Sequence, residues 1–422
     1  MRLQAAYDDF IFLPYQGFDQ MDQIKAYEKV GGFQAWSKAL AMGAESCRSE
    51  IMVSQLRDLG FERTALSKLW NISSQQADSM VVFHCAYQIP DDESLHTLIE
   101  SYPFLFLEGV LITLFSLNIL KCEIVLAHHE KTIQDKLIFC LNQLREDSKY
   151  KEYMSSLIIK ISRVPEVGVW SLGADLLEGL SHQGILQNKP VVSEYKRAIV
   201  QNGLTTCALP WITRFGAGAF KNFKGSHGQG TVLITLKGDI EQPGVYEVPV
   251  GTPVMSLIDH YGGGIKDGRS IKGLIVNGGY GRLIPASLLV ELVLCPFEFL
   301  KFGLRLGPAS FIVVDESKDM RAILKKGIDH FLKNRNYFSQ PETMAVACFN
   351  RWLDEYQHRS VLIENQREQA SLLAAILRPL IDRHNSSSAF LFGQFIESVI
   401  ENYLDDLLPV KELNPQMVEV KS

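Results

Sequence analysis

The sequence predicts an α/β protein in three parts, namely a layered α/β domain, a β-grasp unit and a C-terminal α-helical bundle. Short β-prone runs alternate with helical patterns from Val81 onwards, a hairpin pattern begins near Gln229, and only helical patterns follow Asp319. The chain has 422 residues, 46% of them hydrophobic, which is enough for several buried cores. A disordered chain is therefore excluded.

Composition also excludes several classes of function. Lys and Arg number 42 against 48 Asp and Glu, so the basic surface typical of nucleic-acid-binding proteins is lacking. The most apolar run, 109–120, has 12 uncharged residues between Glu108 and Lys121, whereas a membrane span needs about 20. Asp8 and Asp9 precede any apolar core of signal-peptide length. We expect a cytoplasmic protein without direct membrane insertion, and a buried helix at 109–120.

The cysteines and the known catalytic patterns point to no metal or catalytic site. The seven cysteines are widely spaced and never form a C-x-x-C pair, which argues against a disulfide framework and a sequence-local metal cluster. G-x-S-x-G, H-E-x-x-H and Walker motifs are absent from the sequence. The sequence therefore predicts neither catalytic nor metal-ligating residues.

The first two segments are an N-terminal arm with its first helix, 1–45, and the α/β domain, 46–225. A helix is predicted over 27–40, entered through Gly31-Gly32, where Phe33, Trp36 and Leu40 recur at near-helical spacing. Within the domain, strands are predicted at 81–83 and 124–126 and helices at 105–120 and 133–144. Residues 205–230, rich in Gly, Lys, Phe and Ser, are predicted to be an exposed linker.

The β-grasp unit is expected at 228–315. Strands at 231–236 and 245–248 flank a Gln-Pro-Gly turn, and Thr252 is expected to cap a helix that ends at Gly262. Further strands are predicted at 274–276, before an Asn-Gly-Gly turn, and at 311–315. The bundle, 316–422, comprises predicted helices at 321–333, 342–356, 361–381 and 388–408, followed by a loose polar tail.

Residues 232–253, V-L-I-T-L-K-G-D-I-E-Q-P-G-V-Y-E-V-P-V-G-T-P, closely resemble the β-grasp (SLBB-like, ubiquitin-like) domain of a known family. That family is the F-type subunit of NADH-quinone oxidoreductase, the NADH-oxidising flavoprotein of respiratory complex I. Residues 26–40 resemble the family's first helix, 106–112 its L-I-E-G-M helix, and 311–316 the strand before its cluster-binding bundle. The resemblance spans about residues 24–355. It implies a Rossmann-like flavin-type domain, with FMN, NADH and a 4Fe-4S cluster as the family's cofactors.

The family's flavin phosphate loop, S-G-L-R-G-R-G-G-A-G-F-P-T-G-L-K-W, matches residues 54–70, which read S-Q-L-R-D-L-G-F-E-R-T-A-L-S-K-L-W. Glycines there let backbone N–H groups approach the phosphate. Only Gly60 remains of them, and Arg57 keeps its place, so these two are the residual cofactor-binding candidates. Asp58 and Glu62 bring carboxylates that would repel a phosphate.

Three further flavin or nucleotide motifs are altered. The acidic N-A-D-E-S-E-P-G motif matches 86–93, where Asp91, Asp92 and Glu93 are expected in a solvated turn or helix start; their reuse in a shifted register stays open. The C-G-E-E-T motif matches 170–180 without its paired glutamates. The V-N-N-V-E-T motif falls near 205–211 without an asparagine pair.

The cluster motif C-G-Q-C-T-P-C matches residues 336–342, so that Asn336, Ser339 and Glu342 stand where the family has thiolates. Cys348 is expected to be a buried core cysteine on its helix. His128 and His129, followed by Glu130, are expected at a strand end facing solvent, since adjacent strand residues point to opposite faces.

The resemblance implies a non-catalytic or altered homologue of this flavoprotein that binds no cofactor and acts as a structural or regulatory component beside other protein subunits. Attachment to a membrane is expected only through such partners, and no nucleic-acid partner is expected. Two alternatives remain open. One is an active NADH dehydrogenase (quinone) subunit with FMN in an unusual site, and the other is a small-ligand-binding protein that uses its β-grasp domain.

Overall fold

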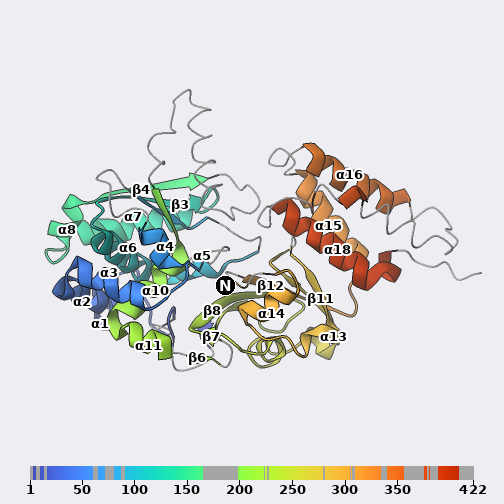
Figure 1. Ribbon diagram of the computed structural model, residues 1–422, viewed down its shortest axis with the longest axis horizontal. Helices are drawn as coiled ribbons and strands as arrows, with labels where there is room; N and C mark the ends of the chain where they lie inside the picture. Colours follow the sequence, from blue (N-terminus) through green and yellow to red (C-terminus); the bar gives the residue numbers. More distant parts are fainter. Residues whose placement is uncertain are drawn as a thin grey trace, which may run out of the picture.

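Figure 1 shows the computed structural model, with the α/β part on the left, the mixed sheet at the lower centre and the C-terminal helices on the right. The structure describes residues 3–5, 10–13, 17–59, 65–71, 80–86, 91–164, 198–222, 224–225, 228–278, 281–304, 306, 309–333, 340–355, 375–377, 380 and 388–407.

A four-stranded, fully parallel sheet lies at the centre of the α/β part. Its order is β4-β3-β2-β5, formed by Ile158–Val164, Lys121–Ala127, Met80–His84 and Ala198–Asn202. Alternate residues divide between its faces, so that Val81 and Phe83 join the largest hydrophobic core while Met80 and Val82 join a small cluster on the other side. The strands predicted at 81–83 and 124–126 are confirmed.

The helices of this part cover the face that carries Val81 and Phe83. They are α3 (Ala44–Val53), α4 (Leu66–Asn71), α5 (Ser94–Ser101), α6 (Pro103–Leu117), α7 (Lys131–Glu146), α8 (Lys151–Ser156), α10 (Gly203–Phe215) and α11 (Ala217–Asn222). Helix α6 is buried at every residue except Phe115, which confirms the predicted buried helix. In the described part of the chain no single helix is long and apolar enough to cross a membrane; α5 and α6 pass that test only together, across a 98° bend.

Helix α10 corrects the prediction of an exposed linker at 205–230. Ten of its residues are buried, including Cys207, Leu209 and Ile212, and it packs directly on α6. A side chain at Gly109 of α6 would lie 2.0 Å from the carbonyl oxygen of Thr206, so only glycine permits this close approach. The glycines after Phe215 suggested a linker, but the apolar face before them decides the structure.

The helix predicted over 27–40 is two helices, α1 (Ile24–Lys29) and α2 (Gln34–Met42). The chain turns between them because Phe33 has a left-handed φ of 58° and Gly32 lies under the ring of Tyr27, where a Cβ atom would be only 2.2 Å from the ring. Tyr27, Phe33 and Trp36 are buried, whereas Leu40 is exposed. The apolar residues on the two sides of Gly31-Gly32 have helical spacing, which predicted one continuous helix where two short helices meet.

The second sheet is mixed and has the order β1-β9-β8-β12-β10-β11. Its strands are Leu3–Ala5, Gly244–Pro249, Thr231–Gly238, Ala309–Asp315, Ile271–Val276 and Leu283–Pro285, in that order. The predicted hairpin is confirmed as antiparallel β8 and β9, and β12 pairs parallel with β8 at the centre. The first strand of the chain, β1, pairs parallel with β9.

One face of this sheet is covered by short helices. They are α12 (Val254–Ser256), which continues as a π-helical turn at Leu257–Tyr261, then α13 (Ala286–Leu289) and α14 (Pro296–Lys301). Thr252 does not cap this helix, because its hydroxyl donates to the carbonyl oxygen of Pro249. The cap position is Pro253, which has no N–H to satisfy.

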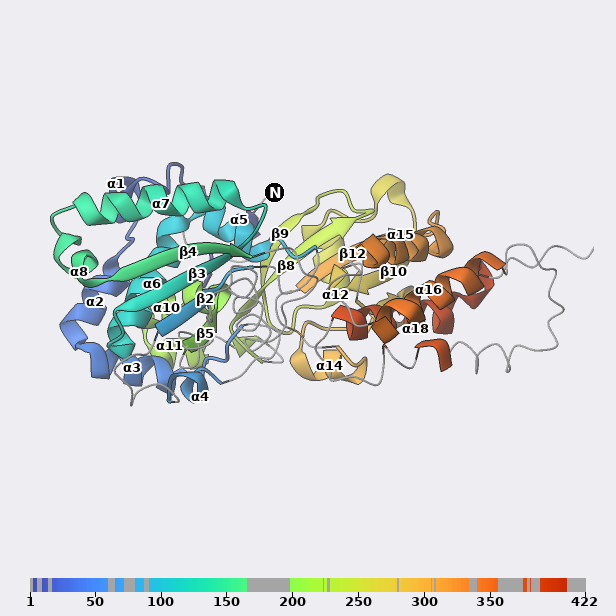
Figure 2. The same ribbon diagram turned by 90° about the horizontal axis from the view of Figure 1, so that it is seen from above.

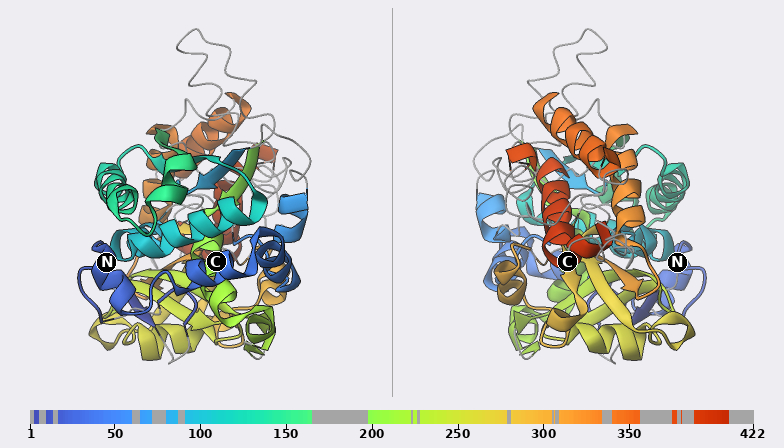
Figure 3. Two further views of the ribbon diagram at one scale, coloured as in Figure 1. Left: turned by 90° about the vertical axis from the view of Figure 1, so that its left-hand side faces the viewer. Right: turned by 90° about the vertical axis from the view of Figure 1, so that its right-hand side faces the viewer.

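The other face of the mixed sheet meets the C-terminal helices, seen from their own end in Figure 3. These are α15 (Met320–Lys333), α16 (Gln340–Glu355) and α18 (Ser388–Leu407), whose apolar residues share one core with Ile275 and Leu283. The helix predicted at 361–381 is described only at 375–377 and 380, and the tail after Pro409 lies outside the described residues.

Candidate functional site

The order of the parallel sheet indicates where a ligand site would lie. Strands β3 and β4 follow on one side of β2, whereas β5 pairs on the other side, so the order reverses between β2 and β5. In parallel α/β sheets, ligands bind outside the carboxyl ends of the strands at such a reversal. In this chain that position lies beside His84 and Asn202, where β2 and β5 end.

The carboxylate of Asp58 occupies this position. Its Oδ1 accepts hydrogen bonds from the backbone N–H of Asn202 (3.1 Å) and from the hydroxyl of Thr205 (2.7 Å). The hydroxyl oxygen of Thr205 in turn accepts from the N–H of Leu59 at 2.7 Å. Helix α10 begins at Gly203, so a negative charge is favoured at its first turn. The chain's own loop thus places a carboxylate at the amino end of α10.

Of the two cofactor-binding candidates in the phosphate loop, Arg57 and Gly60, the structure describes only Arg57. Arg57 is exposed, forms an antiparallel bridge with Ala65, and lines a pocket of about 410 Å³ on the side of the loop that carries Gln55 and Leu56. Gly60 and Glu62 lie outside the described residues.

Sequence reasoning missed Asn202. Residues 200–205, V-Q-N-G-L-T, span the end of β5 and the start of α10, and they share Val200, Asn202 and Thr205 with V-N-N-V-E-T. The side chain of Asn202 caps α10 by accepting from the N–H of Leu204 at 2.7 Å. The sequence signal that could have identified Asn202 is a β-branched run followed by Asn-Gly. Alignment with the family conceals this signal, because the alignment places the V-N-N-V-E-T motif at 205–211, inside the helix.

The acidic run at 91–93 joins the two sheets. Asp92 is buried and accepts from the N–H of Ser94 and from the hydroxyl of Thr235 on β8, each at 3.0 Å. Glu93 forms an ion pair with Lys237. Burial raises the pKa of Asp92, and these hydrogen bonds oppose that rise. A helix does start after this run, as predicted, at Ser94. The prediction that Asp92 lies in a solvated turn is wrong, because β8 covers its side chain.

His128, His129 and Glu130, which are adjacent in sequence, do not gather at one site. His128 and His129 are exposed after β3, as predicted. Glu130 instead lies 2.8 Å from Nδ1 of the buried His96, whose Nε2 is 2.7 Å from the carbonyl oxygen of Cys85. In the described ranges no group of three or more His, Cys, Asp or Glu residues is arranged to hold a metal ion.

His84 is expected to make the fold sensitive to acid. Burial lowers its pKa to about 3, well below its ordinary value of 6.5. The unfolded chain therefore binds a proton that the folded chain does not, and stability falls as pH drops below about 6.5. From pH 7 to pH 5 we expect a loss of about 2 kcal/mol that His84→Gln removes. Urea unfolding at both pH values measures it, with exposed His128→Gln as control. Equal pH slopes for wild type and His84→Gln would contradict this assignment.

The cluster region can be described only in part. Asn336 and Ser339 lie outside the described residues, and Glu342 is buried in the first turn of α16. Cys348 is exposed, which corrects its prediction as a core cysteine. Helix α16 buries Ala345, Val346, Phe349, Trp352 and Leu353, so position 348 falls on the outward face. Residues 87–90 and 170–180, which match two other motifs, are also outside the described residues.

The chain is similar in sequence to known proteins. A family model described as SLBB domain matches residues 233–276, which include most of β8 and all of β9 and β10. The F-type subunit of NADH-quinone oxidoreductase in Aquifex aeolicus is 24% identical over 348 residues, covering 79% of this chain and 78% of the relative. The chain is similar to this subunit over most of its length. Its counterpart in Buchnera aphidicola of Acyrthosiphon pisum is 26% identical over 326 residues, 71% of each chain.

Solved structures agree on the fold. Two structures of an NAD+-reducing [NiFe]-hydrogenase, air-oxidized and H2-reduced, match with TM-scores of 0.68 and 0.71 at 17% identity. They cover 88% and 89% of this chain, and the chain spans 64% of each hydrogenase chain. Together with the oxidoreductase relatives, they support a mixed α/β architecture with parallel and mixed sheets and an SLBB domain.

Proposed function

We propose that this chain is a non-catalytic relative of the F-type flavoprotein that serves as a structural or regulatory component of a multi-subunit assembly and binds no FMN. We place it in the cytoplasm, with any membrane attachment made through its partners. The observation that carries the proposal is the Asp58 carboxylate at the amino end of α10, bonded to Asn202 and Thr205. The names of the relatives, subunits of an oxidoreductase, support a role beside other protein subunits.

A flavin phosphate does not fit beside this carboxylate. The N–H of Asn202 and the hydroxyl of Thr205, which an incoming anion would need, already donate to Asp58. Two unit charges 4 Å apart repel by about 4 kcal/mol at an effective dielectric constant of about 20, or nearly three powers of ten in affinity. The loss of all family glycines except Gly60 acts in the same direction.

The cluster positions support the same proposal. A 4Fe-4S cluster is normally held by four cysteine thiolates. Here Asn336, Ser339 and Glu342 occupy the matching positions, and Cys348 is the last cysteine of the sequence. Without ligands for a cluster, a flavin on this chain would lack the electron acceptor that the family's cluster provides.

Substitutions at Asp58 test the blocked position. We expect wild-type protein to bind FMN only in the millimolar range or not at all. Asp58→Asn keeps an acceptor oxygen but removes the charge, and Asp58→Gly removes both; we expect affinity to rise by about a hundredfold to a thousandfold in the glycine variant and by less in the asparagine variant. Titration followed by flavin fluorescence measures this, with Asp58→Glu as the charge-retaining control.

The native protein distinguishes the alternatives. Stoichiometric flavin in the absorption spectrum of the purified chain, or NADH oxidation with an artificial electron acceptor, would identify an active enzyme with an unusual site and overturn our proposal. Native mass spectrometry of material purified from its own cells is expected to detect partner subunits in fixed ratio. A free monomer throughout would contradict the role in an assembly and favour the ligand-binding alternative.

A further inference from the structure

An aromatic and cationic surface lies where α1, α2 and α10 meet, away from the strand-end site. Trp211 and Phe215 lie one turn apart on α10 with their ring centroids 5.0 Å apart, and Phe215 is 51% exposed. Helices α1, α2 and α10 lie in the left half of Figure 2, whereas the C-terminal helices α15, α16 and α18 lie at its right. We refer to Lys29, Lys38, Trp211, Arg214 and Phe215 together as the α10 surface.

The three cations of the α10 surface have no carboxylate partner among the described residues. The guanidinium of Arg214 lies 5.1 Å from the ring centroid of Phe215 and packs against Gly31, 3.3 Å from the place that a Cβ atom would occupy there. The ammonium of Lys38 donates to the carbonyl oxygen of Arg214 at 3.0 Å, and Lys29 is exposed at the end of α1. On a chain with a net charge of -6, three such cations in one place favour an external anionic group.

The shape of the α10 surface indicates which class of partner it fits. A hollow of about 20 Å³ lies between Ala35, Pro210 and the aromatic rings of α10, whereas small-molecule sites have about 300 Å³ or more. Glu108 also lines the hollow, but it is buried and its oxygens already accept three hydrogen bonds. A shallow surface of aromatic and arginine side chains is typical of a contact between proteins, where these residue types contribute most of the binding energy.

We propose that the α10 surface binds an acidic segment of a partner subunit in which carboxylates lie beside an apolar side chain. One carboxylate pairs with the guanidinium of Arg214 through parallel N–H···O hydrogen bonds, and further carboxylates lie near Lys29 and Lys38. The apolar side chain covers the exposed ring of Phe215. This inference rests on the proposed role in a multi-subunit assembly and names the surface through which one partner is held.

Other occupants fit the α10 surface less well. In a two-fold contact between two copies of this chain the same surface would meet itself, so that its cations would face cations. An anionic membrane or a nucleic acid would attract the three cations but repel the chain as a whole, because its net charge is -6. An acidic segment of a protein matches the cations without that opposition.

Chemical cross-linking of the native assembly tests for the acidic partner. A carbodiimide joins an amine directly to a carboxylate that it contacts. In the assembly purified from the protein's own cells, we expect mass spectrometry to find Lys29 and Lys38 joined to Asp or Glu residues of a partner subunit. An assembly that contains partner subunits but gives no such cross-link at either lysine would overturn the inference.

Two variants with matched controls locate the contact. Arg214→Glu and Phe215→Ala are each expected to retain less than about a tenth of the partner subunit that wild type retains, because a central arginine or aromatic contributes about thirtyfold to affinity. Arg145→Glu and Phe139→Ala change an exposed arginine and an exposed phenylalanine on α7 and are expected to behave as wild type. Unfolding temperatures verify that all four variants are folded.

The outcomes separate this inference from the proposed function. Partner retention in Arg214→Glu and Phe215→Ala equal to that of wild type would overturn the inference and leave the proposed function intact. Absence of partner subunits from every preparation, wild type included, would contradict both. Dimerisation of the purified chain, or its binding to phosphatidylserine vesicles at about 0.15 M salt, would overturn the inference if Arg214→Glu abolishes it.

Discussion

Replacing Glu247 with leucine is expected to destabilise the protein by about 3–5 kcal/mol. The buried carboxylate of Glu247 accepts from the N–H groups of Ile11 (2.7 Å) and Leu13 (2.9 Å), from that of Phe12, and from the hydroxyl of Thr231 (2.6 Å). Each buried donor left without an acceptor costs about 1–3 kcal/mol. Burial raises the pKa of this carboxyl group, and the donors oppose that rise.

The loss of stability in Glu247→Leu should appear first where residues 11–13 of the N-terminal arm contact β9. Hydrogen exchange at the amides of residues 11–13 is expected to accelerate in Glu247→Leu before exchange in the parallel sheet does. Glu247→Gln retains one acceptor oxygen and is expected to lose about half as much stability. Glu291→Leu removes an exposed glutamate from the same region and is the control. Unchanged amide exchange at 11–13 would show that the carboxylate does not hold the arm.

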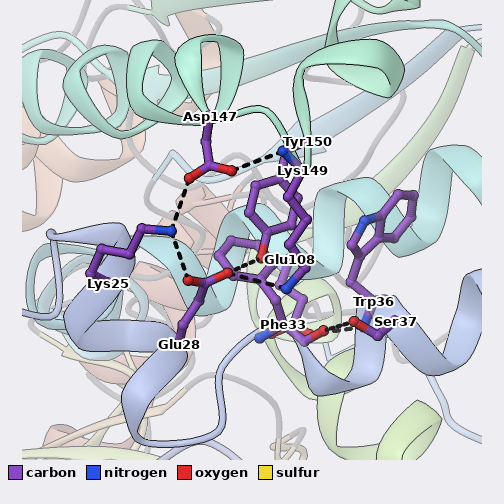
Figure 4. A network of polar contacts seen from close by, with 9 residues as sticks. All are labelled: Lys25, Glu28, Phe33, Trp36, Ser37, Glu108, Asp147, Lys149 and Tyr150. Carbon is purple, nitrogen blue, oxygen red and sulfur yellow. Dashed lines mark hydrogen bonds and ion pairs between the residues drawn. The ribbon is translucent and has the colours of Figure 1, made fainter.

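Replacing Glu108 with leucine is expected to cost a similar 3–5 kcal/mol. Figure 4 shows Glu108 close to Phe33 and Trp36. It accepts from the hydroxyl of Tyr27 (2.7 Å) and from the N–H groups of Phe33 (3.1 Å) and Trp36 (2.9 Å). The amino end of α2 therefore depends on a glutamate from α6, and these donors oppose the increase in pKa that burial causes at Glu108.

A double-mutant cycle separates the contact with Tyr27 from the rest. Tyr27→Phe and Glu108→Gln, measured singly and together by urea unfolding, are expected to show a coupling free energy of about 1 kcal/mol. Exposed Glu146→Leu on α7 serves as the control and is expected to change stability by less than about 0.5 kcal/mol. A coupling of zero would mean that the hydroxyl contributes nothing to the turn between α1 and α2.

Local patterns predicted those elements whose residues interact with near neighbours in sequence. The β8–β9 hairpin has β-branched strands on both sides of a Pro-Gly turn, and these two strands pair with each other across that turn. The strand at 309–315 was equally clear from its apolar run. By contrast, α10 was obscured by the glycines that follow it, and its burial depends on Gly109 from a different part of the chain.

From the sequence, the candidate site could be predicted only through the family residues that this chain lacks. The sequence identifies Asp58 as a carboxylate within a former glycine loop. Its partners, Asn202 and Thr205, lie 144 and 147 positions away, so nothing in local spacing relates them. The contact of Asp92 with Thr235 on β8 could not be predicted for the same reason, since the two residues are far apart in sequence. Cys348 was misplaced because helical spacing alone does not fix which face of α16 meets the core.

The pairing of β1 with β9 has a consequence for synthesis on the ribosome. Leu3–Ala5 and the arm at 10–13 are made before their partners Val245, Tyr246 and Glu247. The whole segment between them must therefore emerge before these residues can reach their final contacts. The α/β part is then expected to fold with its amino end still unattached, so a nascent chain stopped before residue 244 should be cut by protease near its N-terminus.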